Sequence, residues 1–362
     1  MKRLFLLMAA CLPIFVFAQK EYTFTAYRNV VNNGYNFWIS TPDDYEAKQS
    51  EMPVVVFLHG NSLCGSDLNR VRRYGCLDAI SMGRDIDAMI IAPQNPGGPW
   101  NPTRIMNVLN WVQERFAMDT NRIYVIGMSL GGYGTFDFVA TYPEKFAAAM
   151  ALCGGSSRKD FCGLNQVPLW IIHGTADRDV SISQSERIVN AMNACGPTTL
   201  LRFDRFKGIN HSQLVKMFYL PETYQWLLSH SKADSVRYVN MDIDINVASL
   251  GNAYQNIDRS ANTIKVADSY STPIPKATNI DTSALSDGEL AKLANTVVPE
   301  KKAPAPATAK PAPSKPSVHI VRRGDTLSAI ARKYHTTVEK LCKINHIKET
   351  SILSLGQKIK LR

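Results

Sequence analysis

The sequence lacks the features that mark several large classes of protein. Its 362 residues contain no grouped His, Cys and carboxylate residues with the spacing of a zinc site, and no glycine-rich loop with the lysine that holds a phosphate. We therefore expect neither a metal nor an organic cofactor. The N-terminal apolar run, residues 4–17, is too short to cross a bilayer and contains Pro13, so we expect no integral membrane span.

The excess of positive charge belongs to the C-terminal tail. The whole chain has a formal net charge of +10, but residues 301–362 hold 14 basic and 3 acidic residues, which leaves residues 1–300 close to neutral. A nucleic-acid partner is therefore not expected. The basic tail fits attachment to an anionic surface better than recognition of a polyanionic substrate elsewhere in the chain.

The N-terminus has the pattern of an export signal. Lys2 and Arg3 precede the apolar run, and Ala18 places a small residue where a signal peptidase would cut, so we expect residues 1–18 to be a signal peptide. Cys11 offers a lipoprotein alternative, but the residues after it stay apolar, as in an uninterrupted signal. The protein is then exported, to the periplasm or the cell wall.

Six cysteines follow the signal segment. They are Cys64, Cys76, Cys153, Cys162, Cys195 and Cys342. Export permits disulfides, and proximity in the sequence suggests pairing the first with the second and the third with the fourth. Free buried thiols are the alternative. A catalytic cysteine is not expected, because none lies on a sharp turn or beside an obvious base.

The predicted fold class is α/β. Apolar runs alternate with helical segments at residues 53–58, 87–92, 122–126, 147–152, 168–172 and 199–203, after two alternating segments at 21–27 and 35–41 that predict antiparallel edge strands. This alternation indicates a doubly wound, mostly parallel sheet covered on both faces, in a catalytic domain over residues 19–231. No insertion is long enough for a large lid, so the site should be open.

A serine lies where a predicted strand turns sharply into a helix. Residues 127–131 read Gly-Met-Ser-Leu-Gly, after the apolar run that ends at Ile126 and before a helical pattern over 135–141. Glycines two residues before and after Ser129 relieve crowding in the strained turn of a nucleophile elbow. The flanking strand and helix strengthen a motif that is weak alone, and they predict Ser129 as a nucleophile.

An acid and a base follow in the chain order Ser, Asp, His. Asp177 comes just after a strand, where α/β sheets gather functional groups, and it is the predicted acid because it lies nearest the strand end. Asp179 and Asp204 are its competitors. His211 lies in a loop after the next strand and is the predicted base. The other histidines precede glycines at strand ends or lie in other segments, where an imidazole usually packs and bonds locally.

Two backbone N–H groups should stabilise the oxyanion of the tetrahedral intermediate. Leu130 follows the nucleophile, and Asn61 lies in the loop after the strand at 53–58, although it could be an ordinary turn residue. Trp100 follows another strand end and could line the acyl or leaving-group pocket, or it could simply pack within its loop.

These residues resemble a known family. The segments 119–136, 142–149 and 153–155, which include the serine turn, are similar to the dienelactone-hydrolase-like serine esterases of the α/β-hydrolase superfamily, over about residues 50–230. Its closest group holds feruloyl and acetylxylan esterases, polyester depolymerases and predicted peptidases. The resemblance implies acyl transfer through an acyl-enzyme without a cofactor. Relatives commonly have a glycine where this chain has Asn210, just before His211. This difference bears on the conformation of the loop and not on the role of the histidine.

The chain changes character after Ser231. Residues 232–298 are polar with short apolar patches, and form either an extended linker or a flap packed on the hydrolase domain. Residues 299–316 are Lys, Pro and Ala, a semi-rigid spacer. The predicted linker therefore covers residues 232–316.

The C-terminal residues 317–362 predict a strand, two helices and a closing strand. This βααβ pattern resembles a LysM module over nearly its full length, with a small basic domain of another kind as the alternative. The resemblance implies binding of N-acetylglucosamine-containing glycan, chiefly peptidoglycan, through the loops after the first strand and before the last. The implied contact residues are Gly324, Asp325, Thr326, Leu327, Ile352 and Leu353.

The sequence as a whole predicts an exported serine carboxylic-ester hydrolase tethered to the wall by its tail. Candidate substrates are acetyl or feruloyl esters of polysaccharides, or O-acyl groups of the wall itself. A serine peptidase on the same triad and a wall-binding protein whose hydrolase domain is inactive are the alternatives.

Overall fold

A computed structural model of the chain describes residues 20–255 and 257–270 and, near the C-terminus, residues 318–321, 327, 330, 331, 334, 336–345, 347 and 357–361. The chain divides into two compact units, Met1–Ile280 and Asp281–Arg362, which are considered separately. The predicted signal peptide, Cys11 and the Lys/Pro/Ala spacer lie outside the described residues.

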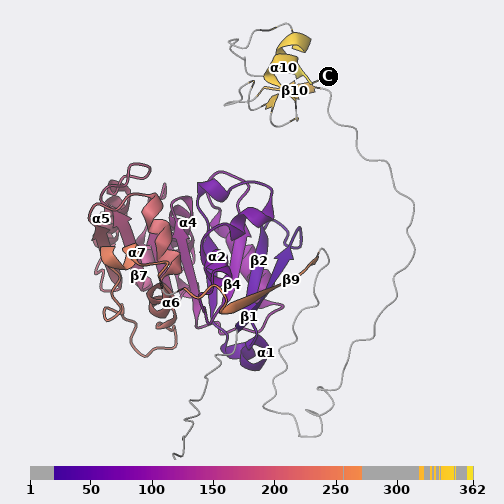
Figure 1. The fold of residues 1–362 in the computed structure, drawn as a ribbon. Helices are drawn as coiled ribbons and strands as arrows, with labels where there is room; N and C mark the ends of the chain where they lie inside the picture. Colours follow the sequence, from indigo (N-terminus) through magenta and orange to yellow (C-terminus); the bar gives the residue numbers. More distant parts are fainter. Residues whose placement is uncertain are drawn as a thin grey trace, which may run out of the picture. The chain divides into compact units, whose positions relative to one another are not determined.

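The first unit is built on one nine-stranded sheet (Figure 1). Its strands are β1 (Lys20–Tyr27), β2 (Asn36–Pro42), β3 (Val54–Leu58), β4 (Met89–Gln94), β5 (Ile123–Met128), β6 (Ala148–Leu152), β7 (Leu169–Gly174), β8 (Leu201–Phe206) and β9 (Asn262–Tyr270). Across the sheet they lie in the order β8-β7-β6-β5-β3-β4-β2-β1-β9. Strands β3 to β8 are parallel, β2 is antiparallel to β4 and β1, and β9 is parallel to β1. This is the mostly parallel α/β-hydrolase sheet that the sequence predicts.

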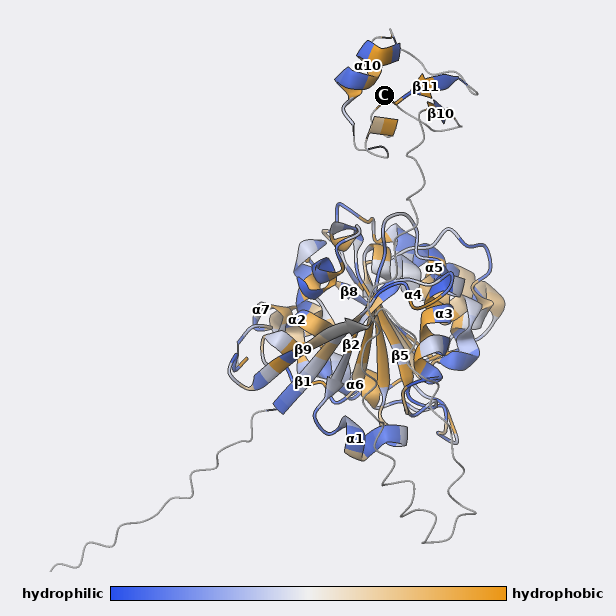
Figure 2. Ribbon diagram, turned by 90° about the vertical axis from the view of Figure 1, so that its right-hand side faces the viewer, coloured by the Kyte–Doolittle hydropathy of each residue, from blue (hydrophilic) through white to orange (hydrophobic). Residues whose placement is uncertain are grey.

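Helices cover both faces of the sheet (Figure 2). The helices of this unit are α1 (Tyr45–Lys48), which has no buried residue, α2 (Cys76–Ser81), α3 (Pro102–Gln113), α4 (Leu130–Thr141), α5 (Ser183–Cys195), α6 (Pro221–Leu228) and α7 (Val247–Gly251). One apolar core contains residues of α2, α6, α7 and the 3-10 helix η6 (Ser212–Tyr219), and the other contains residues of α3, α4 and α5. Successive strand residues point into opposite cores, as Val55 and Val56 of β3 do, which explains the unbroken apolar runs of the sequence.

The first unit extends beyond residue 231, the predicted end of the hydrolase domain. Ile245 and Leu250 are buried in one of its cores, and β9 pairs with β1 and forms the outer edge of the sheet. Residues 232–270 therefore pack on the hydrolase instead of linking it to the tail. The sequence signal was weak because these apolar residues are few and widely spaced among polar ones.

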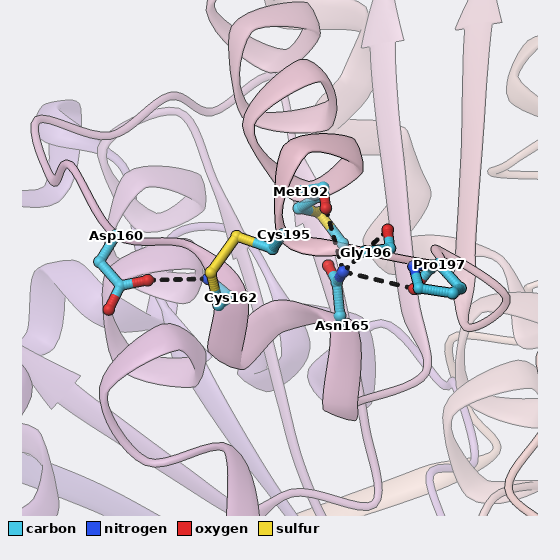
Figure 3. The surroundings of a disulfide bond; sticks show 7 residues. All are labelled: Asp160, Cys162, Asn165, Met192, Cys195, Gly196 and Pro197. Atoms are coloured by element: carbon cyan, nitrogen blue, oxygen red, sulfur yellow. Dashed lines mark hydrogen bonds between the residues drawn. A yellow bond between two sulfur atoms is a disulfide. The ribbon is translucent and has the colours of Figure 1, made fainter.

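A disulfide joins Cys162 and Cys195, with their Cα atoms 5.2 Å apart (Figure 3). It connects the 3-10 helix η5 (Cys162–Gln166) to the last residue of α5. Beside it, the side-chain amide of Asn165 donates to the carbonyl of Met192 at 3.0 Å. The disulfide and this hydrogen bond both tie η5 to the C-terminal end of α5.

Both pairings suggested by proximity in the sequence are wrong. The cysteines at 64, 76 and 153 are free, and so is Cys342 in the second unit. Cys162 pairs with a residue 33 positions away because α5 and β7 bring that residue back beside η5. Only the path of the chain in three dimensions determines such a pair.

The second unit has a small core of its own. Strands β10 (Val318–Ile320) and β11 (Lys358–Lys360) pair antiparallel, and helix α10 (Val338–Asn345) contacts β11. The Asn345 side chain donates to the carbonyl of Lys360 and accepts from its N–H, at 2.8 and 2.7 Å. This bond pair ties the end of the helix to the closing strand.

No helix within the part of the chain that the structure describes is long and apolar enough to cross a bilayer.

Candidate active site

Ser129 occupies a strained turn between β5 and α4. Its φ and ψ are 58° and −122°, a conformation that residues other than glycine rarely adopt. A Cβ on Gly131 would lie 1.8 Å from the Leu58 carbonyl oxygen, and one on Gly127 would lie 2.2 Å from the Gly131 carbonyl oxygen. Both glycines of the motif are therefore required by close packing, which lets the turn present the serine at the strand end.

His211 donates a short hydrogen bond to Asp177. His211 Nδ1 lies 2.7 Å from Asp177 Oδ2, and the carboxylate is fully buried while the ring is 16% exposed. The other oxygen, Oδ1, accepts the N–H groups of Asp179 and Val180 at 3.0 and 2.9 Å. Because the carboxylate can only accept, the proton of the neutral ring is on Nδ1, and Nε2 is left with its lone pair.

Of the three candidate acids, only Asp177 contacts the histidine ring. Asp204 Oδ2 accepts from Trp170 Nε1 and from Arg202 Nε, both at 2.8 Å. Asp179 is exposed beside His211 but makes no hydrogen bond to it. The turn after β7 thus directs the Asp177 carboxylate inward and the Asp179 carboxylate outward.

Ser129 and His211 line one cavity of about 500 Å³. The other lining residues are Gly60, Asn61, Ser62, Tyr74, Met128, Asp179, Ser212 and Val215. Among the described residues, Ser129 Oγ has no hydrogen-bond partner, so it makes no hydrogen bond to the imidazole. Contacts between a nucleophile and its base are often long before substrate is bound. Both side chains nevertheless face the same cavity, which lies at the C-terminal ends of the parallel strands.

The loop after β3 lies directly over the serine. A Cβ on Gly60 would be 3.5 Å from Ser129 Cβ, and the Gly60 N–H donates to Tyr74 Oη at 2.8 Å. In the described part of the chain, the N–H groups of Asn61 and Leu130 have no acceptor. Leu130 is the first residue of α4, so its N–H also lies at the positive end of that helix. Two unpaired donors therefore lie close to the serine.

His59 holds this loop in place, which is the local packing that its position before a glycine predicted. Its Nε2 accepts the Asn95 N–H at 3.0 Å, so its proton is on Nδ1, which donates to the Gly60 carbonyl at 2.8 Å. The ring is fully buried, and burial lowers its pKa to about 4. His59 is therefore neutral and structural, and its position at the end of β3 was the available signal.

Trp100 does not line the cavity, contrary to one of the two possibilities left open by the sequence. Its side chain is 3% exposed, and its Nε1 donates to the His59 carbonyl at 3.2 Å. A Cβ on Gly134 would lie 2.7 Å from the indole, so α4 packs tightly against it. Trp100 supports the loop from behind, and Tyr74, which the sequence did not single out, takes the place in the cavity.

His173 packs locally, as its position before a glycine predicted. Its Nδ1 lies 2.8 Å from Ser185 Oγ and its Nε2 lies 2.9 Å from the Val180 carbonyl oxygen. Burial lowers its pKa, which favours the neutral ring. Because Val180 also donates to Asp177, His173 buttresses the turn that holds the acid.

Two groups of potential metal ligands occur in the described part of the chain, and neither suits a metal ion. Cys153, Asp177 and His211 offer ligand atoms within 4.8 Å of one another. Asp177 and His211 are already hydrogen-bonded to each other. Burial raises the pKa of the Cys153 thiol well above its usual value, which opposes formation of the thiolate that would bind a metal ion. The second group contains both cysteines of the disulfide and so offers no thiolate.

Of the six predicted glycan-contact residues in the second unit, the structure describes one. Leu327 is 6% exposed and belongs to that unit's apolar core, so it stabilises the fold instead of presenting a surface to glycan. The other predicted contacts, Gly324, Asp325, Thr326, Ile352 and Leu353, lie outside the described residues.

Parts of the chain match known protein families and proteins. Residues 319–362 match the LysM domain, and residues 98–161 match the Prolyl oligopeptidase family. Acetylxylan esterase A of Aspergillus awamori is 34% identical over 86 residues, which is 24% of this chain and 28% of that protein. Acetylxylan esterase A of Emericella nidulans is 28% identical over 145 residues, 39% of this chain and 46% of that protein. The matched segment thus spans less than half the length of each relative.

Solved structures of esterases share parts of the chain trace. The crystal structure of a thermostable esterase has a TM-score of 0.47 and 24% identity, and the match covers 57% of this chain and 63% of that one. The observed sheet and the sequence matches to acetylxylan esterases and to the LysM domain confirm the predicted resemblance to α/β-hydrolase esterases and to a C-terminal LysM module.

Proposed function

We propose that the protein is a serine carboxylic-ester hydrolase that works through an acyl-enzyme. The observation that carries the proposal is the 2.7 Å hydrogen bond from His211 to the buried Asp177, in the loops that bring His211 and Ser129 to one cavity. The similarity to acetylxylan esterases supports ester hydrolysis in particular.

The residues divide the chemistry among them. His211 Nε2 takes the proton of the Ser129 hydroxyl as the serine oxygen attacks the ester carbonyl carbon. Asp177 keeps the imidazole in the Nδ1–H tautomer and stabilises the imidazolium that forms. The imidazolium then protonates the leaving alcohol oxygen as the C–O bond breaks, and a water activated by the same histidine hydrolyses the acyl-enzyme.

The unpaired N–H groups of Asn61 and Leu130 form the proposed oxyanion hole. They lie near Ser129 without another acceptor, so they can donate to the carbonyl oxygen as its negative charge develops. Tyr74 accepts the neighbouring Gly60 N–H, and His59 donates to the Gly60 carbonyl, so both ends of that residue are held. The hole is thereby preorganised before substrate arrives.

The proposed substrates are acyl esters of carbohydrates, such as acetyl or feruloyl groups on polysaccharides or O-acyl groups of the cell wall. We further propose that the enzyme is exported and attached to peptidoglycan through its LysM module. The Cys162–Cys195 disulfide supports export, because disulfides persist in oxidising compartments. The basic tail suits an anionic wall.

Chromogenic acetate and butyrate esters tested against aminoacyl amides decide between hydrolase classes. The esterase proposal expects the esters to be cleaved much faster. A serine peptidase is the second candidate, because residues 98–161 match the Prolyl oligopeptidase family, and amide cleavage at rates similar to ester cleavage would favour it.

Labelling of the full chain with a fluorophosphonate tests for an active nucleophile. We expect label on the wild type and none on Ser129→Ala. Absence of labelling on both, with intact folding by circular dichroism, would indicate a wall-binding protein without hydrolase activity.

Sedimentation with insoluble peptidoglycan tests attachment. The full chain should pellet and a chain truncated before residue 317 should stay in solution. A truncated chain that still pellets would overturn the role of the LysM module.

A further inference from the structure

A second cavity of about 410 Å³ adjoins the one that holds the serine. It lies between the loops that follow β7 and β8, and its lining residues are Ala176, Arg178, Asp179, Gly208, Asn210, His211 and Ser212. Three of them, Asp179, His211 and Ser212, also line the first cavity. The two cavities therefore meet at the histidine of the proposed triad.

The direction of proton transfer gives this cavity a role. If the protein is the proposed esterase, the carbonyl carbon is placed at Ser129 in the first cavity, and His211 must reach the leaving oxygen to protonate it. The atoms beyond that oxygen then continue past His211, toward the second cavity. We propose that the second cavity binds the alcohol part of the ester and selects a polyhydroxylated alcohol, a sugar residue.

The lining side chains have the chemistry that such an alcohol needs. Asp179 and Arg178 are exposed, and neither side chain has a hydrogen bond or an ion pair with another residue that the structure describes. Asn210 Oδ1 accepts from Ser212 Oγ and from the Gln213 N–H, both at 3.0 Å, which leaves its NH₂ group free to donate. Sugar hydroxyls both donate and accept, so they can pair with the carboxylate and with the two donors at once.

The contrast between the two cavities supports the assignment. The first has apolar groups for an acyl chain, on Met128 and Val215, whereas the only apolar side chain lining the second is the methyl of Ala176. An apolar alcohol in the second cavity would displace water from the charged groups without replacing its hydrogen bonds. Because the charges of Arg178 and Asp179 are opposite, a neutral sugar fits better than an acidic or basic one.

Two acetate esters whose alcohol parts contain a ring of the same size test the proposal. One is a monoacetylated methyl xylopyranoside, and the other is cyclohexyl acetate, which has a six-membered ring without hydroxyls. The quantity measured is the ratio of their kcat/KM values, for the full chain and for Asp179→Asn and Arg178→Ala. Glu46→Gln is the matched control, since this exposed residue on α1 follows the end of β2, which lies beside the start of β4 at the end of the strands opposite to the site (Figure 1).

We expect the wild type and Glu46→Gln to prefer the sugar ester equally, and Asp179→Asn to reduce the ratio about tenfold, the effect of replacing a charged hydrogen-bond acceptor by a neutral one. Arg178→Ala should reduce it in the same direction. An unchanged ratio would overturn the proposal. If it came with an equal loss on both esters, Asp179 would act only through the charge of the triad. Failure of the wild type to cleave either ester would instead refute the esterase function itself.

Discussion

Replacement of Asp177 by Asn tests the arrangement of the triad most directly. Oδ1 of Asp177 accepts two backbone N–H groups, so the carbonyl oxygen of an asparagine must take that place. Its NH₂ group then faces His211, where it can only donate. The imidazole must turn to the tautomer with its proton on Nε2, which cannot accept the serine proton.

The expected loss is about 10⁴-fold in kcat, or about 5.5 kcal/mol of transition-state stabilisation, the size seen when a triad acid enforces the wrong tautomer. The site offers little relief, because the Asp177 side chain is fully buried and the two donors to its Oδ1 are backbone groups that cannot rotate away. KM should change little, since the substrate does not touch this residue. Steady-state hydrolysis of methyl acetate measures both constants, and thermal unfolding checks that the variant is folded.

Asp179→Asn is the matched comparison, because it alters the competing carboxylate two residues further along. It should lose no more than about tenfold on methyl acetate, an ester whose alcohol is too small to use the second cavity. Retention of more than about a tenth of the wild-type kcat by Asp177→Asn would refute the tautomer argument. A larger loss from Asp179→Asn than from Asp177→Asn would move the acid to the other residue.

Three further outcomes follow from the contacts around the site. Tyr74→Phe removes the acceptor of the Gly60 N–H and should lower kcat about tenfold with little change in KM, and an unchanged kcat for methyl acetate would mean that this bond does not position the loop. His59 has a pKa of about 4 in the folded protein against 6.5 when unfolded, so the unfolded chain binds the proton more readily, and stability should fall by about 3 kcal/mol as the pH drops from 6.5 to 4. Urea unfolding over that range measures it, and His59→Gln should flatten the dependence. Cys195→Ser removes the disulfide to Cys162, and an entropic model for a separation of 33 residues predicts that the free energy of unfolding falls by about 4 kcal/mol. Urea unfolding measures this change, and an unchanged unfolding midpoint would contradict the prediction.

The predictions that came closest to the structure concern short segments. The strand at 123–128, the turn at Ser129 and the helix after it follow one another directly in the sequence, so local pattern and glycine spacing are enough to place them. The buried strands were readable for the same reason, because a strand covered on both faces must be apolar throughout. The order Ser, Asp, His then limited the choice of partners.

The remaining features depend on residues that meet only after folding. The sequence favoured Asp177 over Asp179 only because Asp177 lies nearest the strand end, whereas the direction of each carboxylate is set by the turn after β7. It placed Trp100 near the site but could not tell that the indole lies behind the loop.

By itself, then, the sequence determined the fold class and the identity of the nucleophile and base that we propose, since each follows from a pattern within a few residues. The tertiary structure decided which acid meets the histidine, which cysteines pair, which aromatic residue enters the cavity, and that β9, at residues 262–270, completes the sheet. These are contacts between segments far apart in the chain. Their free energy depends on distance and direction in space, and neither is encoded in the local pattern.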